Sequence, residues 1–177
     1  MKLTDFVVGD AIITEIKATE KEAVIREMVC SLKDAQKINP KDVENILKSL
    51  MKREELGSTG IGKGVAVPHT KHDCIKKITG TIARSTNGVD FNALDGEPVH
   101  LFFLLLSPND SAGLHLAALE RISTVIRDND FRRFMRVANG RDGIIKGENK
   151  CNHKSNRNQQ QKPHGAKYIP LLIGKGN

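Results

Sequence analysis

The sequence predicts a layered α/β domain, in which a β-sheet packs against helices. Two observations support this class. Between residues 19 and 56, apolar side chains recur every three or four positions, as they do in amphipathic helices. Residues 99–106 (VHLFFLLL) are the most apolar stretch and indicate a central strand that is covered on both faces. Because helical and strand patterns mix along 177 residues, one α/β domain fits them best.

Two helices are expected first. One spans residues 19–37, where Thr19 and Glu22 have the spacing of an N-terminal capping box. The next begins at Asn39-Pro40, because asparagine caps helices and proline suits the first helical position, and it ends before the glycine that follows residue 56. The expected buried stripes are Val24, Met28, Leu32 and Ala35 in the first helix, and Val43, Ile46, Leu47 and Leu50 in the second.

A loop with four glycines, residues 57–64, leads into the strands. The expected order after this loop is a short buried strand at residues 65–67 closed by Pro68-His69, a strand at 78–84, a turn at Asn87-Gly88, a short edge strand at 89–91, a turn at 94–96 and the central strand at 99–106. Two helices should follow, marked by Leu114, Leu119, Ile122 and Ile126 and then by Phe131, Phe134 and Met135.

The composition changes after Asn139. Asn, Gln, Lys and His dominate as far as Pro163, and such a segment buries too little apolar surface to offset the entropy of ordering. We therefore divide the chain into a folded domain at residues 1–145 and a basic, disordered tail at residues 146–177. A shifted reading frame near residue 146 is an alternative origin of this tail.

The net charge of +7 belongs mainly to the tail. Residues 146–177 contain seven basic residues and one acidic residue, which leaves 21 basic and 20 acidic residues in the domain. A nucleic-acid-binding module is therefore an alternative that depends on the tail, and we expect no specific nucleic-acid partner for the domain.

Other classes of protein are disfavoured. The longest unbroken apolar run, residues 101–106, is far shorter than the roughly 20 residues of a membrane span, and the N-terminus lacks the apolar core of a secretory signal. The three cysteines, Cys30, Cys74 and Cys151, form no C-x-x-C pair, which fits a reducing compartment. We expect a cytoplasmic protein that is not inserted in a membrane.

The glycine loop is a near match to a phosphate-binding P-loop. Gly57 and Gly62-Lys63 fit G-x-x-x-x-G-K, but Gly64 stands where Ser or Thr would hold magnesium. A P-loop also follows a strand and opens a helix, whereas this loop does the reverse. The alternatives are a flexible connection with positive φ angles, or a cradle in which the amides and the hydroxyls of Ser58 and Thr59 hold a small phosphoryl group.

His69 is a candidate nucleophile, because a neutral imidazole offers a free ring nitrogen at neutral pH. The alternative is a surface histidine without a role. His69, His72 and Cys74 also have the spacing H-x-x-H-x-C, with His115 as a remote further ligand, which keeps a zinc hydrolase open as a remote alternative. Side chains on a turn need not converge, so we expect no metal and no cofactor, with His72 and Cys74 as bystanders.

His115 begins an apolar helix, where the positive end of the helix dipole disfavours a charged ring and suits a neutral donor toward a phosphoryl oxygen. A partly buried helix histidine is the alternative. Arg53 lies in the last turn of the second helix. It either satisfies terminal carbonyls or reaches across the glycine loop as a phosphate clamp.

Taken together, these segments resemble a known family. Residues 52–69, KREELGSTGIGKGVAVPH, are similar to the signature of phosphotransferase-system (PTS) enzyme IIA domains of the fructose/mannitol class, which includes the nitrogen-regulatory IIA proteins. Further similarity lies in residues 91–99 and 106–116, and the resemblance covers roughly residues 3–140. Thr70 departs from the family, in which a small Gly or Ala usually follows the histidine, and the family usually continues with a final helix where this chain has its basic tail.

The resemblance implies a mixed, largely parallel sheet flanked by helices. It implies that His69 accepts the phosphoryl group, that His115 donates a hydrogen bond to it, and that Arg53 stabilises the transferring charge. Ser58, Thr59 and Gly60 match the loop beside the site and are expected to bind phosphate.

The implied activity is a phosphotransferase component with a phosphohistidine intermediate. Its donor would be an HPr-like phosphocarrier protein, and its acceptor a IIB domain or a regulatory target. The chain contains no attached IIB or permease domain, which favours the nitrogen-regulatory type over a fructose/mannitol-type sugar-uptake subunit.

Overall fold

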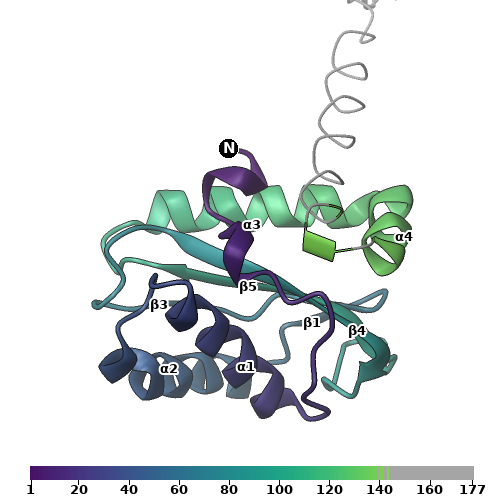
Figure 1. The fold of residues 1–177 in the computed structure, drawn as a ribbon, viewed down its shortest axis with the longest axis horizontal. Helices are drawn as coiled ribbons and strands as arrows, with labels where there is room; N and C mark the ends of the chain where they lie inside the picture. The colour runs from purple at the N-terminus through teal and green to yellow at the C-terminus, as the bar shows by residue number, and fades with distance from the viewer. Residues whose placement is uncertain (139, 142, 144–177) are drawn as a thin grey trace, which may run out of the picture.

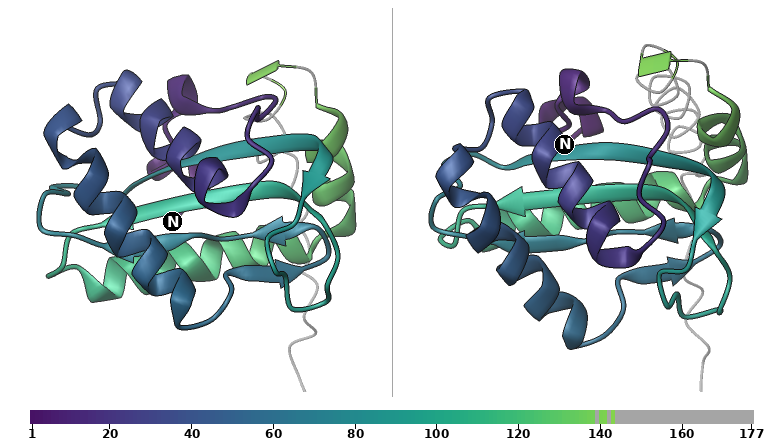
Figure 2. Two further views of the ribbon diagram at one scale, coloured as in Figure 1. Left: turned by 90° about the horizontal axis from the view of Figure 1, so that it is seen from below. Right: turned by 60° about the horizontal axis from the view of Figure 1, so that its bottom comes forward.

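The computed structural model describes residues 1–138, 140, 141 and 143 and confirms the α/β class. A mixed sheet lies between two helical layers (Figure 1). Helices α1 (Lys21–Asp34) and α2 (Val43–Glu55) cover one face, and α3 (Ala112–Arg127) and α4 (Asn129–Val137) cover the other, as the two further views show (Figure 2).

The sheet is organised around its longest apolar strand. Strand β5 has β4 on one side, running antiparallel, and on its other side β2 followed by β3, both running parallel; β1 forms an antiparallel hairpin with β2. The bounds are β1 (Gly60–Gly62), β2 (Val65–Ala66), β3 (His69–Lys71), β4 (Thr79–Val89) and β5 (Val99–Ser107).

The central position predicted for residues 99–106 is confirmed. Phe102, Leu104 and Leu106 belong to the core under α1 and α2, whereas the alternate residues of β5 belong to the core under α3 and α4. Successive side chains of a strand point to opposite faces, so a strand buried on both faces needs an apolar residue at nearly every position. β5 is therefore shared by both cores.

Strands β2 and β3 form one interrupted line beside β5. Val65 lies opposite Leu101 and His69 lies opposite Leu105, so the register is the same on both sides of the interruption. Pro68 has no N–H to donate, but its carbonyl accepts a hydrogen bond from the amide of Leu105 at 3.0 Å. Strand β2 does end before Pro68, as expected, but His69 does not close the strand region: pairing resumes there as β3.

The first twenty residues line the outer side of β4. They form two short 3-10 turns, η1 (Leu3–Asp5) and η2 (Gly9–Ala11), and make single parallel bridges from Val7 to Gly80 and from Ile13 to Ala83. Figure 1 shows this segment passing from the α3 side of the sheet to the α1 side. It covers an edge of the sheet that would otherwise expose unpaired backbone groups.

Two expected helix starts differ from the structure. Helix α1 begins at Lys21, so its N-cap is Glu20, which makes no side-chain cap and bridges to Asp90; the capping box predicted from Thr19 and Glu22 is not formed. Asn39 does accept a hydrogen bond from the amide of Lys41 at 3.1 Å, but the turn that it opens is the 3-10 turn η3 (Pro40–Asp42), which precedes α2. The predicted buried stripe of α2 and its end before Gly57 are confirmed.

The turn predicted at Asn87-Gly88 is wrong, and so is the separate edge strand after it. Strand β4 continues to Val89, and its pairing with β5 is irregular between Arg84 and Val89. Gly88 has a φ of 78° and donates its amide to the hydroxyl of Ser85 at 3.1 Å. A glycine with positive φ serves a strand irregularity as well as a hairpin turn, and the local sequence does not distinguish them.

The glycine segment is also more regular than expected, since residues 60–62 form β1 and turn back at Lys63-Gly64, where both φ angles are positive. Leu114 marks α3 as predicted but is 51% exposed. The proposed tail at residues 146–177 and the boundary at residue 145 lie outside the described residues. Within the described part of the chain, no helix is both long and apolar enough to span a membrane.

Candidate functional site

His69 is the first residue of β3 and is half-buried at the point where the strand resumes after Pro68. Its Nδ1 lies 2.7 Å from the carbonyl oxygen of Val67. A carbonyl can only accept, so Nδ1 carries the proton in this contact. In the neutral ring, Nε2 is then the nitrogen with the free lone pair.

The surroundings of His69 favour that neutral ring. Burial lowers the pKa of His69 below its usual value, and the positive charge of Arg53 lowers this pKa further. The hydrogen bond to Val67 and the negative charge of Glu54 oppose the shift without reversing it. At neutral pH the ring is therefore uncharged and can act as a nucleophile.

His115 lies in the first turn of α3 and is buried. Its Nδ1 is 2.7 Å from the hydroxyl of Ser107, the last residue of β5, which is also buried. Burial, followed by the positive charges of His69 and Lys71, lowers the pKa of His115 to about 4. The predicted position at the helix start is confirmed, and this ring is also neutral at pH 7.

The two imidazoles meet near the carboxyl end of β5, where His69 begins β3 opposite Leu105 and His115 contacts Ser107. Their ring centroids are 5.5 Å apart, with the ring planes tilted by 51°. In open α/β sheets, ligands bind beyond the carboxyl ends of parallel strands. The sheet therefore brings together two histidines that are 46 positions apart in the sequence, and it does so where a ligand site is expected.

Arg53 lies in the last turn of α2, and its guanidinium donates to the carbonyl of Gly57 at 3.0 Å. This is the carbonyl-binding role that its place in the helix predicted. The same side chain is close enough to His69 to lower the pKa of its ring. Arg53 therefore adds positive charge near His69.

The loop residues Ser58, Thr59 and Gly60 lie beside this site, but their polar groups are already in use. The Ser58 hydroxyl donates to the carbonyl of Phe91 at 3.0 Å and accepts from the amide of Gly60 at 3.1 Å. Thr59 is buried, and both its amide and its hydroxyl donate to the carboxylate of Glu54. In this structure these groups stabilise the loop.

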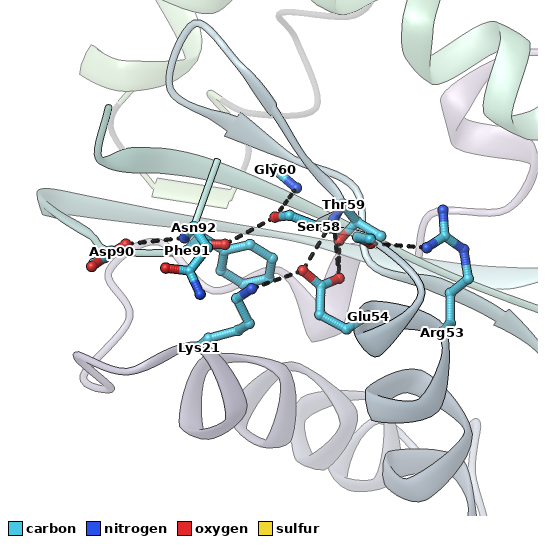
Figure 3. Close-up of polar contacts among 10 residues, drawn as sticks. Lys21, Arg53, Glu54, Ser58, Thr59, Gly60, Asp90, Phe91 and Asn92 are labelled. Carbon is cyan, nitrogen blue, oxygen red and sulfur yellow. Dashed lines mark hydrogen bonds and ion pairs between the residues drawn. The ribbon is translucent and has the colours of Figure 1, made fainter. Parts of the chain in front are cut away.

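Glu54 is the centre of that network (Figure 3). Its carboxylate is buried, accepts from Thr59, and pairs with the Lys21 ammonium at 3.0 Å. Lys21 in turn lies 5.0 Å from the centre of the Phe91 ring. The network ties the start of α1, the end of α2 and the glycine segment together.

His72 and Cys74 do not join His69 in a metal site. The His72 ring accepts a hydrogen bond from the Cys74 amide at 3.2 Å, which closes a local turn. Among residues 1–138, 140, 141 and 143, no three His, Cys, Asp or Glu side chains are grouped as metal ligands would be. The zinc alternative therefore has no geometric support in the described residues.

Sequence reasoning missed three residues of this region: Glu54, Lys21 and Ser107. A signal for Glu54 was present, because it follows Leu50 by four positions and so continues the buried stripe of α2. Lys21 and Ser107 carried no comparable signal, since their partners come from distant segments of the chain.

Residues 6–147 match the family model for the phosphoenolpyruvate-dependent sugar phosphotransferase system, EIIA 2. The chain belongs to this EIIA 2 family. It is therefore related to phosphotransfer components of that system, as the resemblance implied.

Relatives of this EIIA 2 domain carry two kinds of name. This chain is 35% identical over 144 residues to a nitrogen regulatory protein of Bradyrhizobium diazoefficiens, and the match covers 81% of this chain and 92% of the relative. It is 37% identical over 145 residues to the fructose-specific EIIABC component of Bacillus subtilis, covering 82% of this chain but 22% of that longer protein. The crystal structure of IIA-Ntr from Neisseria meningitidis superposes with a TM-score of 0.74 at 29% identity, covering 82% of this chain and 97% of that chain.

The buried state of His115 predicts an unusual titration. We expect its ring to gain a proton only as the pH falls to about 4, because burial and the charges of His69 and Lys71 disfavour the imidazolium. Between the ordinary value of about 6.5 and this lower pKa, the unfolded chain holds a proton that the folded EIIA 2 domain does not, so this group lowers the stability of the fold as the pH falls.

Ring ¹⁵N chemical shifts recorded against pH measure this directly. Lys71→Met should raise the midpoint, since it removes one of the positive charges. A midpoint near 6.5 in the folded wild-type protein would contradict the assigned environment of His115.

Proposed function

We propose that this EIIA 2 domain is a phosphoryl carrier in which Nε2 of His69 accepts phosphate from an HPr-like phosphocarrier protein. One observation carries the proposal: the bond from Nδ1 of His69 to Val67 leaves Nε2 as the free nitrogen, in a ring that lies 5.5 Å from a second neutral histidine. Membership of a phosphotransferase family supports it.

The transfer step needs little covalent chemistry from the protein. The lone pair of Nε2 attacks phosphorus, a new N–P bond forms, and the N–P bond of the donor phosphohistidine breaks with its electron pair returning to the donor ring. Phosphoryl transfer passes through a loose transition state with charge spread over the equatorial oxygens. Positioning and charge stabilisation therefore supply most of the rate.

His115 and Arg53 are suited to that stabilisation. If the Ser107 hydroxyl donates to Nδ1 of His115, the neutral ring carries its proton on Nε2 and donates it in a hydrogen bond to a phosphoryl oxygen. Because the pKa of His115 is lowered to about 4, the ring is neutral at pH 7, and its one N–H donates this hydrogen bond. Arg53 adds a permanent positive charge near His69.

Ser58, Thr59 and Gly60 were expected to bind phosphate, and in this proposal they do so only indirectly. Their hydroxyl and amide groups are satisfied within the protein, so they act on phosphate by holding the loop rather than by direct hydrogen bonds. Loss of those bonds would release the backbone segment that leads to Val67.

The phosphate then passes to a IIB partner or changes the affinity of the domain for a regulatory target. We favour the nitrogen-regulatory type. The support is 35% identity across most of a relative with that name and the TM-score of 0.74 to IIA-Ntr. The similarity to a fructose-specific component supports the sugar-uptake alternative. Rapid transfer from the phosphorylated domain to a purified fructose-type IIB domain would favour uptake, and no transfer would favour regulation.

The first prediction is that His69 is the acceptor. Incubation with phosphoenolpyruvate, the donor enzyme and HPr should raise the intact mass by one phosphate, in an acid-labile linkage, and His69→Ala should abolish the increase. His72→Ala is the matched control, because its ring closes a local turn, and it should still accept phosphate. Normal phosphorylation of folded His69→Ala would overturn the assignment.

The second prediction concerns the partner of His115. Ser107→Ala removes the hydroxyl that holds this ring, and we expect transfer to slow about 10-fold, roughly the effect of one hydrogen bond. Stopped-flow phosphorylation measures the rate. Ser85→Ala, another buried serine in the sheet, is the control and should leave the rate unchanged. Equal rates for Ser107→Ala and Ser85→Ala would contradict a role for Ser107.

A further inference from the structure

Glu54 is a buried carboxylate that the transfer step does not use directly. Its side chain is 4% exposed, and it accepts from the Thr59 amide at 3.0 Å and from the Thr59 hydroxyl at 2.6 Å (Figure 3). Burying a carboxylate is strongly unfavourable unless it is paired and hydrogen-bonded. Lys21 supplies the pairing at 3.0 Å, so the buried charge is fully compensated.

From Glu54 a continuous series of hydrogen bonds leads to the imidazole of His69. The carbonyl of Thr59 accepts from the amide of Val67 at 2.9 Å, and the carbonyl of Val67 accepts from Nδ1 of His69 at 2.7 Å. Because Val67 precedes a proline, its backbone is restricted to extended conformations. A displacement of Thr59 is therefore passed on to the Val67 carbonyl and from there to the ring.

The other side of the loop is anchored as well. Lys21 lies over the Phe91 ring, and the Phe91 carbonyl accepts from the Ser58 hydroxyl. Glu54 thus lies where three segments meet: the start of α1, the loop after α2, and the segment before β5. Glu54 and Thr59, which form the centre of this network, are both buried.

We propose that Glu54 is a positioning residue for phosphoryl transfer: it fixes Thr59, and through Thr59 the Val67 carbonyl that holds Nδ1 of His69. The inference rests on the proposed function of His69. It assigns Lys21 the supporting role of pairing with the carboxylate and holding it in place. The alternative is that Glu54 only neutralises the charge of Lys21, and this predicts that removing both charges together restores the rate.

The test begins with Glu54→Gln, which keeps the shape but loses the charge and one acceptor for Thr59. We expect the rate at saturating phosphorylated HPr to fall about 10- to 100-fold, as a small misplacement of a reacting group does, while the KM for HPr stays the same. Ring ¹⁵N shifts should show that His69 loses part of its Nδ1-protonated form. Glu55→Gln, the exposed neighbour on α2, is the matched control and should change neither measurement.

A double variant separates positioning from charge compensation. Lys21→Met with Glu54→Gln removes both charges, so a merely structural role predicts recovery of the rate and of the His69 ring signal. The proposal predicts recovery of stability alone, because Thr59 still lacks one of its two acceptor oxygens. If Glu54→Gln fails to fold, Thr59→Val tests the same link by deleting only the hydroxyl, and it should shift the His69 ring signal in the same direction by a smaller amount.

The proposal is overturned if Glu54→Gln behaves like Glu55→Gln, if the rate falls while the His69 ring signal is unchanged, or if the double variant restores both. The ring signal is measured without any phosphate donor. A wild-type protein that shows the Nδ1-protonated ring but accepts no phosphate would therefore refute the proposed function and leave the positioning of the ring by Glu54 standing on its own measurement.

Discussion

The site depends on one hydrogen bond, from Nδ1 of His69 to the carbonyl of Val67, at 2.7 Å. This bond decides which ring nitrogen is free, because a carbonyl accepts only from a protonated nitrogen. It also holds the ring of His69 near the ring of His115, 5.5 Å away. Burial then keeps both rings neutral, as the proposed transfer requires of a nucleophile and of a neutral hydrogen-bond donor. A different bond at Nδ1 would change the chemistry without altering the fold.

The sheet makes that bond possible through an interruption that preserves register. Pro68 cannot donate to β5, yet His69 returns to the pairing that Val65 began. The break frees the carbonyl of Val67 from strand pairing and turns it toward the ring two residues later. Because β3 and β5 are parallel, the helix that follows β5 begins beside the end of β3, and its first turn contributes His115.

The sequence predicted the class of fold, the central strand and the two histidines, because apolar periodicity and the run ending in Pro68-His69 are local signals. It did not predict what depends on distant partners. Asn87-Gly88 has the composition of a turn, but β4 runs on through an irregular stretch and resumes pairing with β5 at Val89, opposite Val99. Glu54 continues the buried stripe of α2, but nothing near it in the sequence identifies its partner Lys21, which lies 33 positions away. Local conformational propensity is overridden where a long-range contact contributes more to the stability of the fold.

The central claim is that His69 reacts through Nε2, and the position of the phosphate on the ring tests it most directly. After phosphorylation by HPr, ¹⁵N and ³¹P NMR of the uniformly labelled protein identify the nitrogen that is bonded to phosphorus. We expect an Nε2 phosphohistidine with Nδ1 still protonated and bonded to Val67. Phosphate on Nδ1 would contradict the account, because the hydrogen bond on which the site is built would have to break before the reaction.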